Sequence, residues 1–415
     1  MSAKRLLLAA AIFALSTGAA LGQEATPTID EMWKIIQQQQ AEIEALKAEI
    51  AETREESAAT AERVEVTESQ IEATGEFVEQ MAEVQSEPSR TSIGGYGELH
   101  YNNYISDTGP DDMIDFHRFV LYFGHEFSDR VRLFSELELE HSLAGDGAPG
   151  EVELEQAYID FALTDNTNVL GGLFLLPIGI LNETHEPDTF YGVERNNVEN
   201  VIIPTTWWEA GAAAYGNFEN GLSWNAAVHS GLAMPTTGSS AFRVRSGRQK
   251  VAEALASDTA YTFRLRYTGL PGLELAATYQ YQSDPSQMPD DGLDSGQLFS
   301  AHARWTEGPF SLTGLYAGWD FSGDAVEAAG ADRQTGWYLE PSWRFNENWG
   351  IYARYEDIEG ARDRDHFTQS ELGFNYWPVP NVVVKFDYRD RDHDLPGEAD
   401  RDFRAIDLGI GYSFY

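Results

Sequence analysis

Residues 131–140 read VRLFSELELE. The odd-numbered positions carry one valine and three leucines around a serine, and the even-numbered positions carry one arginine and three glutamates around a phenylalanine. Successive side chains of a β-strand point to opposite faces, so this alternation places an apolar stripe on one face and a charged stripe on the other. The stretch therefore predicts a strand that separates an apolar environment from a polar one.

The same period of two residues recurs through most of the chain. We find sixteen segments that carry it, at residues 92–104, 113–127, 130–142, 152–163, 168–176, 206–218, 221–232, 260–268, 272–282, 296–306, 309–321, 333–345, 349–358, 367–376, 381–389 and 402–415. Each segment with its connection takes about 20 residues, which suits antiparallel hairpins and leaves no room for crossover helices. The fold class predicted for this part of the chain is all-β.

The N-terminus has the pattern of an export signal. Lys4 and Arg5 precede ten apolar residues, 6–15, and small residues stand at Ala20 and Gly22. A membrane-spanning helix needs roughly 20 apolar residues, twice the length of this run. The pattern predicts a signal peptide over residues 1–22, cleaved before Gln23.

The alternation alone fits two all-β architectures, a soluble β-sandwich and a transmembrane β-barrel. The predicted export signal favours the barrel. The short connections fall at every second junction, and aromatic residues gather near the strand ends, as they do at membrane interfaces. These features together predict a 16-stranded antiparallel transmembrane β-barrel over residues 90–415, with the charged phase facing a water-filled lumen. Its place is the outer membrane of a Gram-negative bacterium, in contact with lipid and lipopolysaccharide.

The last strand carries a further sign of that location. Its apolar phase ends on aromatic residues and resembles the C-terminal signal read by the barrel-assembly machinery, at Ile406, Leu408, Ile410, Tyr412 and Phe414. The chain ends one residue later, at Tyr415, out of phase with that stripe.

Residues 23–89 follow a different period. Isoleucine recurs every seventh residue at Ile29, Ile36, Ile43 and Ile50, with Glu, Lys and Arg between, which favours an α-helical coiled coil on the periplasmic side. The segment holds 17 acidic and 4 basic residues, so a solitary solvated helix or a disordered linker is the alternative. A coiled coil here predicts an oligomer, without choosing between two and three strands, and peptidoglycan is a candidate partner for it.

Composition excludes several classes of function. The formal net charge of -40 argues against a nucleic-acid partner, and the absence of cysteine removes disulfides, thiolate nucleophiles and cysteine-ligated metals. No catalytic motif occurs, so we expect no enzyme activity, no cofactor and no metal site. The histidines are scattered, and the period places His117 and His125 in the apolar phase of their strand.

One connection is much longer than a hairpin loop. Residues 177–205 read PIGILNETHEPDTFYGVERNNVENVIIPT, and loops of this length are usually functional. The loop follows the fifth strand, where general porins fold a loop into the lumen. Residues 154–160 (LEQAYID), residues 172–180 (GLFLLPIGI) and the pair Glu194-Arg195 resemble the E-A-Y-hydrophobic-D strand, the G-x-F-x-x-P-F-G-L segment and the E-R pair of the phosphate-selective porin O/P family.

The resemblance implies an outer-membrane porin, by family a trimer, that passes small hydrophilic solutes and ions by diffusion. Phosphate-specific members line their pores with lysines and arginines, whereas this barrel has only Lys250 and Lys385 and holds 51 acidic against 22 basic residues. The family resemblance therefore does not assign phosphate as the solute, although phosphate stays among the candidate solutes. A structural protein that tethers the envelope, with the barrel as its anchor, is the alternative function.

Two sets of residues are candidates for the pore. If residues 177–205 fold inward, the constriction would contain Glu183, His185, Glu186, Asp188, Glu194 and Arg195. The lumen phase of the strands would present Arg118, Arg132, Arg264, Arg266, Arg304, Arg344, Arg354 and Lys385. The carboxylates predict a weak preference for cations. The wall arginines would either create a transverse field that favours small polar solutes or merely neutralise wall carboxylates in salt bridges.

Overall fold

The computed structural model describes residues 90–105, 110–395, 397–398 and 401–415, together with six isolated helical positions between 33 and 47. The predicted signal peptide, residues 1–22, and almost all of the predicted coiled coil, residues 23–89, lie outside the described residues. Both stay predictions. Among the described residues, no helix has the length and hydropathy that a bilayer crossing requires.

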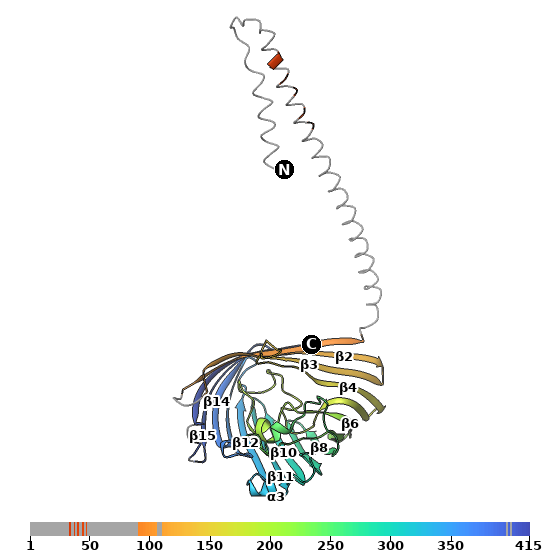
Figure 1. The fold of residues 1–415 in the computed structure, drawn as a ribbon, viewed down its shortest axis with the longest axis vertical. Helices are drawn as coiled ribbons and strands as arrows, with labels where there is room; N and C mark the ends of the chain where they lie inside the picture. The colour runs from red at the N-terminus through yellow and green to blue at the C-terminus, as the bar shows by residue number, and fades with distance from the viewer. Residues whose placement is uncertain are drawn as a thin grey trace. The chain divides into compact units, whose positions relative to one another are not determined.

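Residues 90–415 form a closed barrel of sixteen antiparallel strands (Figure 1). Each strand pairs with its neighbours in sequence, and β1 pairs with β16 to close the sheet, with Gly95 opposite Phe414. The strands are β1 Thr91–Tyr104, β2 Met113–Ser128, β3 Val131–Glu140, β4 Val152–Thr164, β5 Thr167–Leu175, β6 Trp208–Asn217, β7 Leu222–His229, β8 Ala260–Leu270, β9 Leu273–Gln282, β10 Ser295–Glu307, β11 Phe310–Ser322, β12 Arg333–Trp343, β13 Trp349–Glu359, β14 His366–Val379, β15 Val382–His393 and β16 Phe403–Phe414.

The predicted fold class is confirmed, and no predicted strand boundary differs from the structure by more than four residues. The two faces also separate as expected. Leu137 is 39% exposed on the outer face of β3, whereas Glu136 and Glu138 are 1% exposed on its inner face. On β16, Leu408 is 45% exposed and Asp407 is fully buried. An apolar outer surface and a polar inner surface are what a barrel in a bilayer requires.

The lumen differs from the prediction in one respect, because apolar packing and not water covers part of its wall. The inner faces of β10, β11 and β12 carry apolar side chains that pack against residues 177–205 and 230–259, which fold into the interior; the buried cluster includes Leu176, Ile178, Ile202, Trp207, Leu232, Met234, Leu298, Leu315, Trp319 and Tyr338. A hydrophobic core therefore fills this side of the barrel, as it would in a soluble domain.

In the part of the barrel that the structure describes, four short helical turns lie in the connections: η1 (Val198–Ile202), η2 (Val244–Gly247), α3 (Asp324–Ala328) and η3 (Asp363–Asp365). Two of them position the residues described below. The turn η1 belongs to the segment after β5, and η2 belongs to the segment after β7.

Candidate functional site

Residues 177–205, hereafter the inward loop, lie within the barrel and contact strands around its circumference. Near its start, Thr278 on β9 donates a hydrogen bond to the carbonyl of Pro177 (3.0 Å). In its middle, Ser413 on β16 donates to Asp188 (2.9 Å), and Lys385 on β15 donates to the carbonyl of Gly192 (2.8 Å). The loop is therefore bonded to well-separated parts of the wall.

Glu199 in η1 fixes the first turn of the inward loop. Its carboxylate accepts hydrogen bonds from the backbone N–H groups of Ile180 and Leu181, at 2.6 Å each, and from the side chain of Asn196. Gly179 has a φ of 72°, and a Cβ at this position would lie 2.5 Å from the Glu199 carboxylate. Glycine is needed here both for the backbone conformation and for the close approach of the carboxylate.

The predicted loop carboxylates do not gather at one point. Glu183 forms an ion pair with Arg264 on β8, Glu186 accepts a hydrogen bond from Tyr122 on β2 (3.2 Å), and Asp188 contacts β16 as described. Each carboxylate therefore contacts a different strand of the wall.

Glu194 lies close to His100 on β1. The His100 Nδ1 atom is 3.2 Å from the Glu194 carboxylate, and Asn102 donates to the same oxygen (3.0 Å). Enclosure by protein acts to raise the pKa of Glu194, but the charge and hydrogen bond of His100 hold that pKa well below its usual range. Glu194 is therefore a paired anion.

His185 is enclosed between the inward loop and the strands β3 and β4. Its Nε2 atom lies 3.4 Å from the carboxylate of Glu136 and 3.7 Å from that of Glu155. The ring meets Tyr96 edge-on, with ring centroids 5.8 Å apart. His185 therefore connects the inward loop to the glutamates of β3 and β4.

Half of the eight predicted wall cations, Arg264 among them, are paired with carboxylates. Arg118 lies 2.7 Å from Glu98 and 3.7 Å from Glu138, and Arg132 forms an ion pair with Asp160. Arg354 contacts three carboxylates at 2.6–2.9 Å, those of Glu340, Glu356 and Glu371. Of the two predicted alternatives, salt bridges with wall carboxylates therefore describe these arginines better than a row of free cations does.

The remaining predicted cations lie in three settings. Lys385 is buried 3.6 Å from the ring centroid of Phe190 in the inward loop. Arg266 and Arg304, with Arg264, line a cavity of about 870 Å³ that also contacts Ser92 and Tyr415. Arg344 follows the end of β12 and lies 4.2 Å above the ring centroid of Trp377. Its position in the short β12–β13 connection, rather than on the strand, corrects the prediction that it lines the wall.

Sequence reasoning missed the cations that the segment after β7 brings inside. Arg245 donates to the carbonyl of Thr205 (2.7 Å), Arg248 to the carbonyl of Thr206, and Arg195 to the Thr206 hydroxyl (3.0 Å). We call Arg195, Arg245 and Arg248 the arginine cluster. Residues 243–250 read RVRSGRQK, the densest basic run of an acidic barrel, and this run was the available signal.

The arginine cluster faces the acidic ends of β3 and β4. Glu140 and Glu153 act electrostatically on Arg248, and Glu138 acts on Arg195. Lys250, close by in the same segment, forms ion pairs with Glu151 and Glu153. Basic residues of this segment and carboxylates of β3 and β4 therefore lie close to one another.

A second cavity, of about 460 Å³, lies at the end of the barrel that carries the long loops. It is lined by Arg243, Arg364, Arg391 and Arg401 with Asp365 and His393. Arg243 holds Asp365 through two hydrogen bonds of 2.9 and 3.0 Å. Arg401 forms an ion pair with Glu398, so two of the four arginines that line this cavity are paired with carboxylates.

The model of the family described as phosphate-selective porin O and P matches residues 94–414. The chain belongs to this family. The porin is also 30% identical over 352 residues to an uncharacterised protein of Aquifex aeolicus, a match that covers 75% of this chain and 78% of that one. The chain is therefore an outer-membrane channel for solute diffusion rather than an enzyme, as the sequence led us to expect.

Solved porins share the fold of this porin at low sequence identity. OmpF of Salmonella typhi, in complex with daunomycin, is 11% identical with a TM-score of 0.54, and the match covers 78% of this chain and 97% of that one. The outer-membrane channel DcaP of Acinetobacter baumannii is 12% identical with a TM-score of 0.53 and the same coverage. A trimer form of OmpT of Vibrio cholerae is 10% identical with a TM-score of 0.51, over 78% and 98% of the two chains.

Proposed function

We propose that this porin passes small hydrophilic solutes and ions of both signs through a constriction between the arginine cluster and the glutamates of β3 and β4. One observation carries the proposal. Arg245 lies inside the barrel, bonded to the end of the inward loop, and yet its side chain is exposed to solvent. An exposed guanidinium surrounded by the barrel wall is reached by water that enters the lumen.

Charge around this constriction supports permeation by anions as well as cations. The loop carboxylates on which a cation preference was predicted are compensated in part, Glu183 by Arg264 and Glu194 by His100. The arginine cluster is less compensated, because the buried atoms Arg195 Nε and Nη2 and Arg248 Nε have no hydrogen-bond partner among the described residues. Guanidinium groups bind phosphate-type oxygens through bidentate hydrogen bonds. Inorganic anions such as phosphate would therefore pass close to the arginine cluster.

A salt-gradient recording in a planar bilayer tests this proposal. The zero-current potential of the wild-type channel should indicate weak selectivity, and replacing Arg245 and Arg248 with Gln should shift it toward cations. Arg404→Gln is the matched control, because Arg404 is exposed on β16 and 3.5 Å from Asp390. A double variant with unaltered selectivity would place the constriction elsewhere.

We further propose that the porin is a homotrimer, with residues 23–89 as a trimerising segment on the periplasmic side. The trimer form of a porin with the same fold and the isoleucine heptads support this assembly. The mass of the detergent-solubilised protein, measured with and without residues 23–89, tests it. A monomer in both cases would overturn the proposal.

A further inference from the structure

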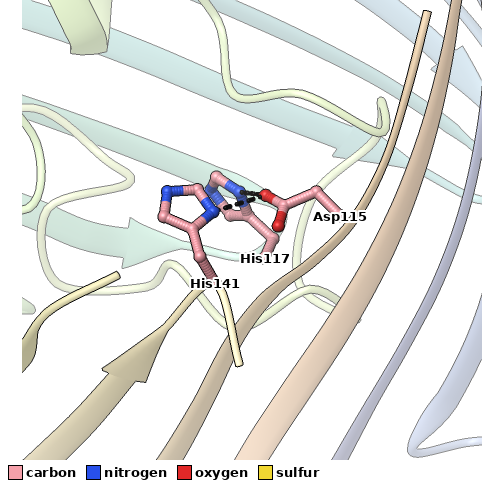
Figure 2. Close-up of side chains that lie close together, drawn as sticks. All are labelled: Asp115, His117 and His141. Carbon is pink, nitrogen blue, oxygen red and sulfur yellow. Dashed lines mark hydrogen bonds and ion pairs between the residues drawn. The ribbon is translucent and has the colours of Figure 1, made fainter. Parts of the chain in front are cut away.

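Three side chains of metal-ligand type meet at the long-loop end of β2 and β3. Figure 2 shows the rings of His117 and His141 directed at the carboxylate of Asp115. The Nδ1 atom of His117 lies 3.0 Å, and that of His141 2.8 Å, from the same oxygen, Oδ2 of Asp115. All three candidate ligand atoms lie within 4.8 Å of one another.

The backbone sets this convergence. The pairing of β1 with β2 shifts between Glu98 and His100, so that two residues of β2, Phe116 and His117, stand opposite one residue of β1. Such a bulge re-aims side chains. It corrects the prediction that His117 belongs to the apolar phase, because the ring of His117 stacks on that of His100, 4.7 Å away at 12°. His100 in turn contacts the inward loop through Glu194, so both rings lie on the lumen side.

His141 is held next to His117 by its own main chain. Its backbone N–H donates to the carbonyl of His117 (3.2 Å), and its φ of 52° turns the chain at the end of β3. The two imidazoles are therefore brought together by paired strands rather than by free rotation of long side chains. Their ring centroids are 5.6 Å apart, edge to face.

We propose that Asp115, His117 and His141 bind a divalent transition-metal ion of the zinc class. Two imidazole nitrogens and one carboxylate oxygen are a ligand set that such ions prefer over calcium or magnesium. Ligand atoms placed about 2.1 Å from one ion in tetrahedral geometry lie about 3.4 Å apart. The two nitrogen–oxygen distances, 3.0 and 2.8 Å, are close to that separation.

The site is open to incoming ions. The side chains of His117 and His141 are 28% and 32% exposed, whereas that of Asp115 is 11% exposed. Three protein ligands leave at least one coordination position for water or for a solute. The site therefore binds the ion at the mouth of the lumen, at a place distinct from the arginine cluster.

Two other clusters of carboxylates and histidine in the described residues fit less well. Glu140, Glu151 and Glu153 already hold Lys250, which occupies the place of a cation. Glu136, Glu155 and His185 are only 1–2% exposed beneath the inward loop, so a solute ion reaches them less readily than the open trio. The comparison singles out the open trio.

Calorimetric titration of the full-length protein in detergent with Zn²⁺ tests the proposal. The wild type should bind one Zn²⁺ per chain, and His141→Ala and Asp115→Asn should each weaken the association by at least about 10- to 100-fold. His125→Ala is the matched control, because His125 lies on the same strand and contacts Thr91 at its other end. Co²⁺ in place of Zn²⁺ should give visible absorption bands in the wild type that both ligand variants lose.

Folding is checked separately, by the heat-modifiable mobility of each variant on a gel. His141 follows the last residue of β3, so its replacement removes no strand pairing. Absence of stoichiometric Zn²⁺ binding by the wild type would overturn the proposal. Equal binding by the wild type and folded His141→Ala and Asp115→Asn would overturn it as well, since the ion would then occupy another site.

Discussion

The inner face of β1–β4 and the inner face of β10–β12 belong to one barrel but are built in opposite ways. The first carries buried charges, among them Arg118, which forms ion pairs with Glu98 and Glu138. The second carries Leu298, Leu315 and Trp319, packed on the inward loop. One side of the lumen is thus a hydrophobic core that anchors the loop, and the other is a charged surface that the loop contacts through polar side chains such as Glu194 and His185.

The largest effect is expected on the apolar side. Trp319 is 1% exposed and donates a hydrogen bond to the carbonyl of Ile202 in η1 (3.0 Å). Trp319→Ala should lower the free energy of unfolding by about 3–5 kcal/mol, because it removes a large buried ring and leaves a cavity. Urea unfolding in detergent measures this. Trp337→Ala, on the outer face of β12 and 40% exposed, is the control and should cost much less.

On the charged side we expect a smaller loss of stability. Arg118→Gln removes the cation next to Glu138, whereas Glu98 keeps His100 at 3.1 Å, and an unpaired buried group costs about 1–3 kcal/mol. The same unfolding experiment measures it, with Arg130→Gln in the exposed β2–β3 turn as control. A loss as large as that of Trp319→Ala would mean that the two sides contribute equally to stability.

Removal of Arg245 and Arg248 together should change selectivity rather than stability. A charge about 8 Å from the ion path contributes about 0.5–1 kcal/mol at the high dielectric of a wet lumen. The ratio of anion to cation permeability should therefore fall about two- to fivefold for each arginine. Zero-current potentials at several salt concentrations measure this. A change in unfolding free energy without a change in permeability would show that the cluster serves only to hold the loop.

The smallest effect is expected from the loop carboxylates. Glu183→Gln frees Arg264, so the zero-current potential should move toward anions by a change in permeability ratio of less than about twofold. The shift should disappear at high salt, where the Debye length falls from about 10 Å at 0.1 M to about 3 Å at 1 M. A large shift that persists in 1 M salt would restore the loop carboxylates as the main selectivity residues.

The sequence predicts the wall of this molecule better than its interior. The period of two residues predicts that Leu137 points outward and Glu138 inward, and sixteen segments with this period define the barrel. Trp319 is apolar and inward, a placement that alternation alone would reverse, because its partner is a distant loop. Arg245 and Arg248 lie in a connection whose sequence lacks the two-residue period of a strand, and a β-bulge turns His117 to the other face of the sheet. In each case the missing information is a long-range contact.

The inward loop is bonded to the wall at many points by short polar contacts. The backbone N–H of Asn197 donates a hydrogen bond to Glu356 (2.7 Å), and that of Val193 donates one to Asp387 (2.7 Å). The carbonyl of Gly192 accepts a hydrogen bond from Lys385. A segment held from several directions has little freedom to fluctuate on the time scale of ion passage. The electrical consequence is a quiet open state: current traces should show long steps with little flicker, and the conductance should be ohmic at either polarity of the applied voltage.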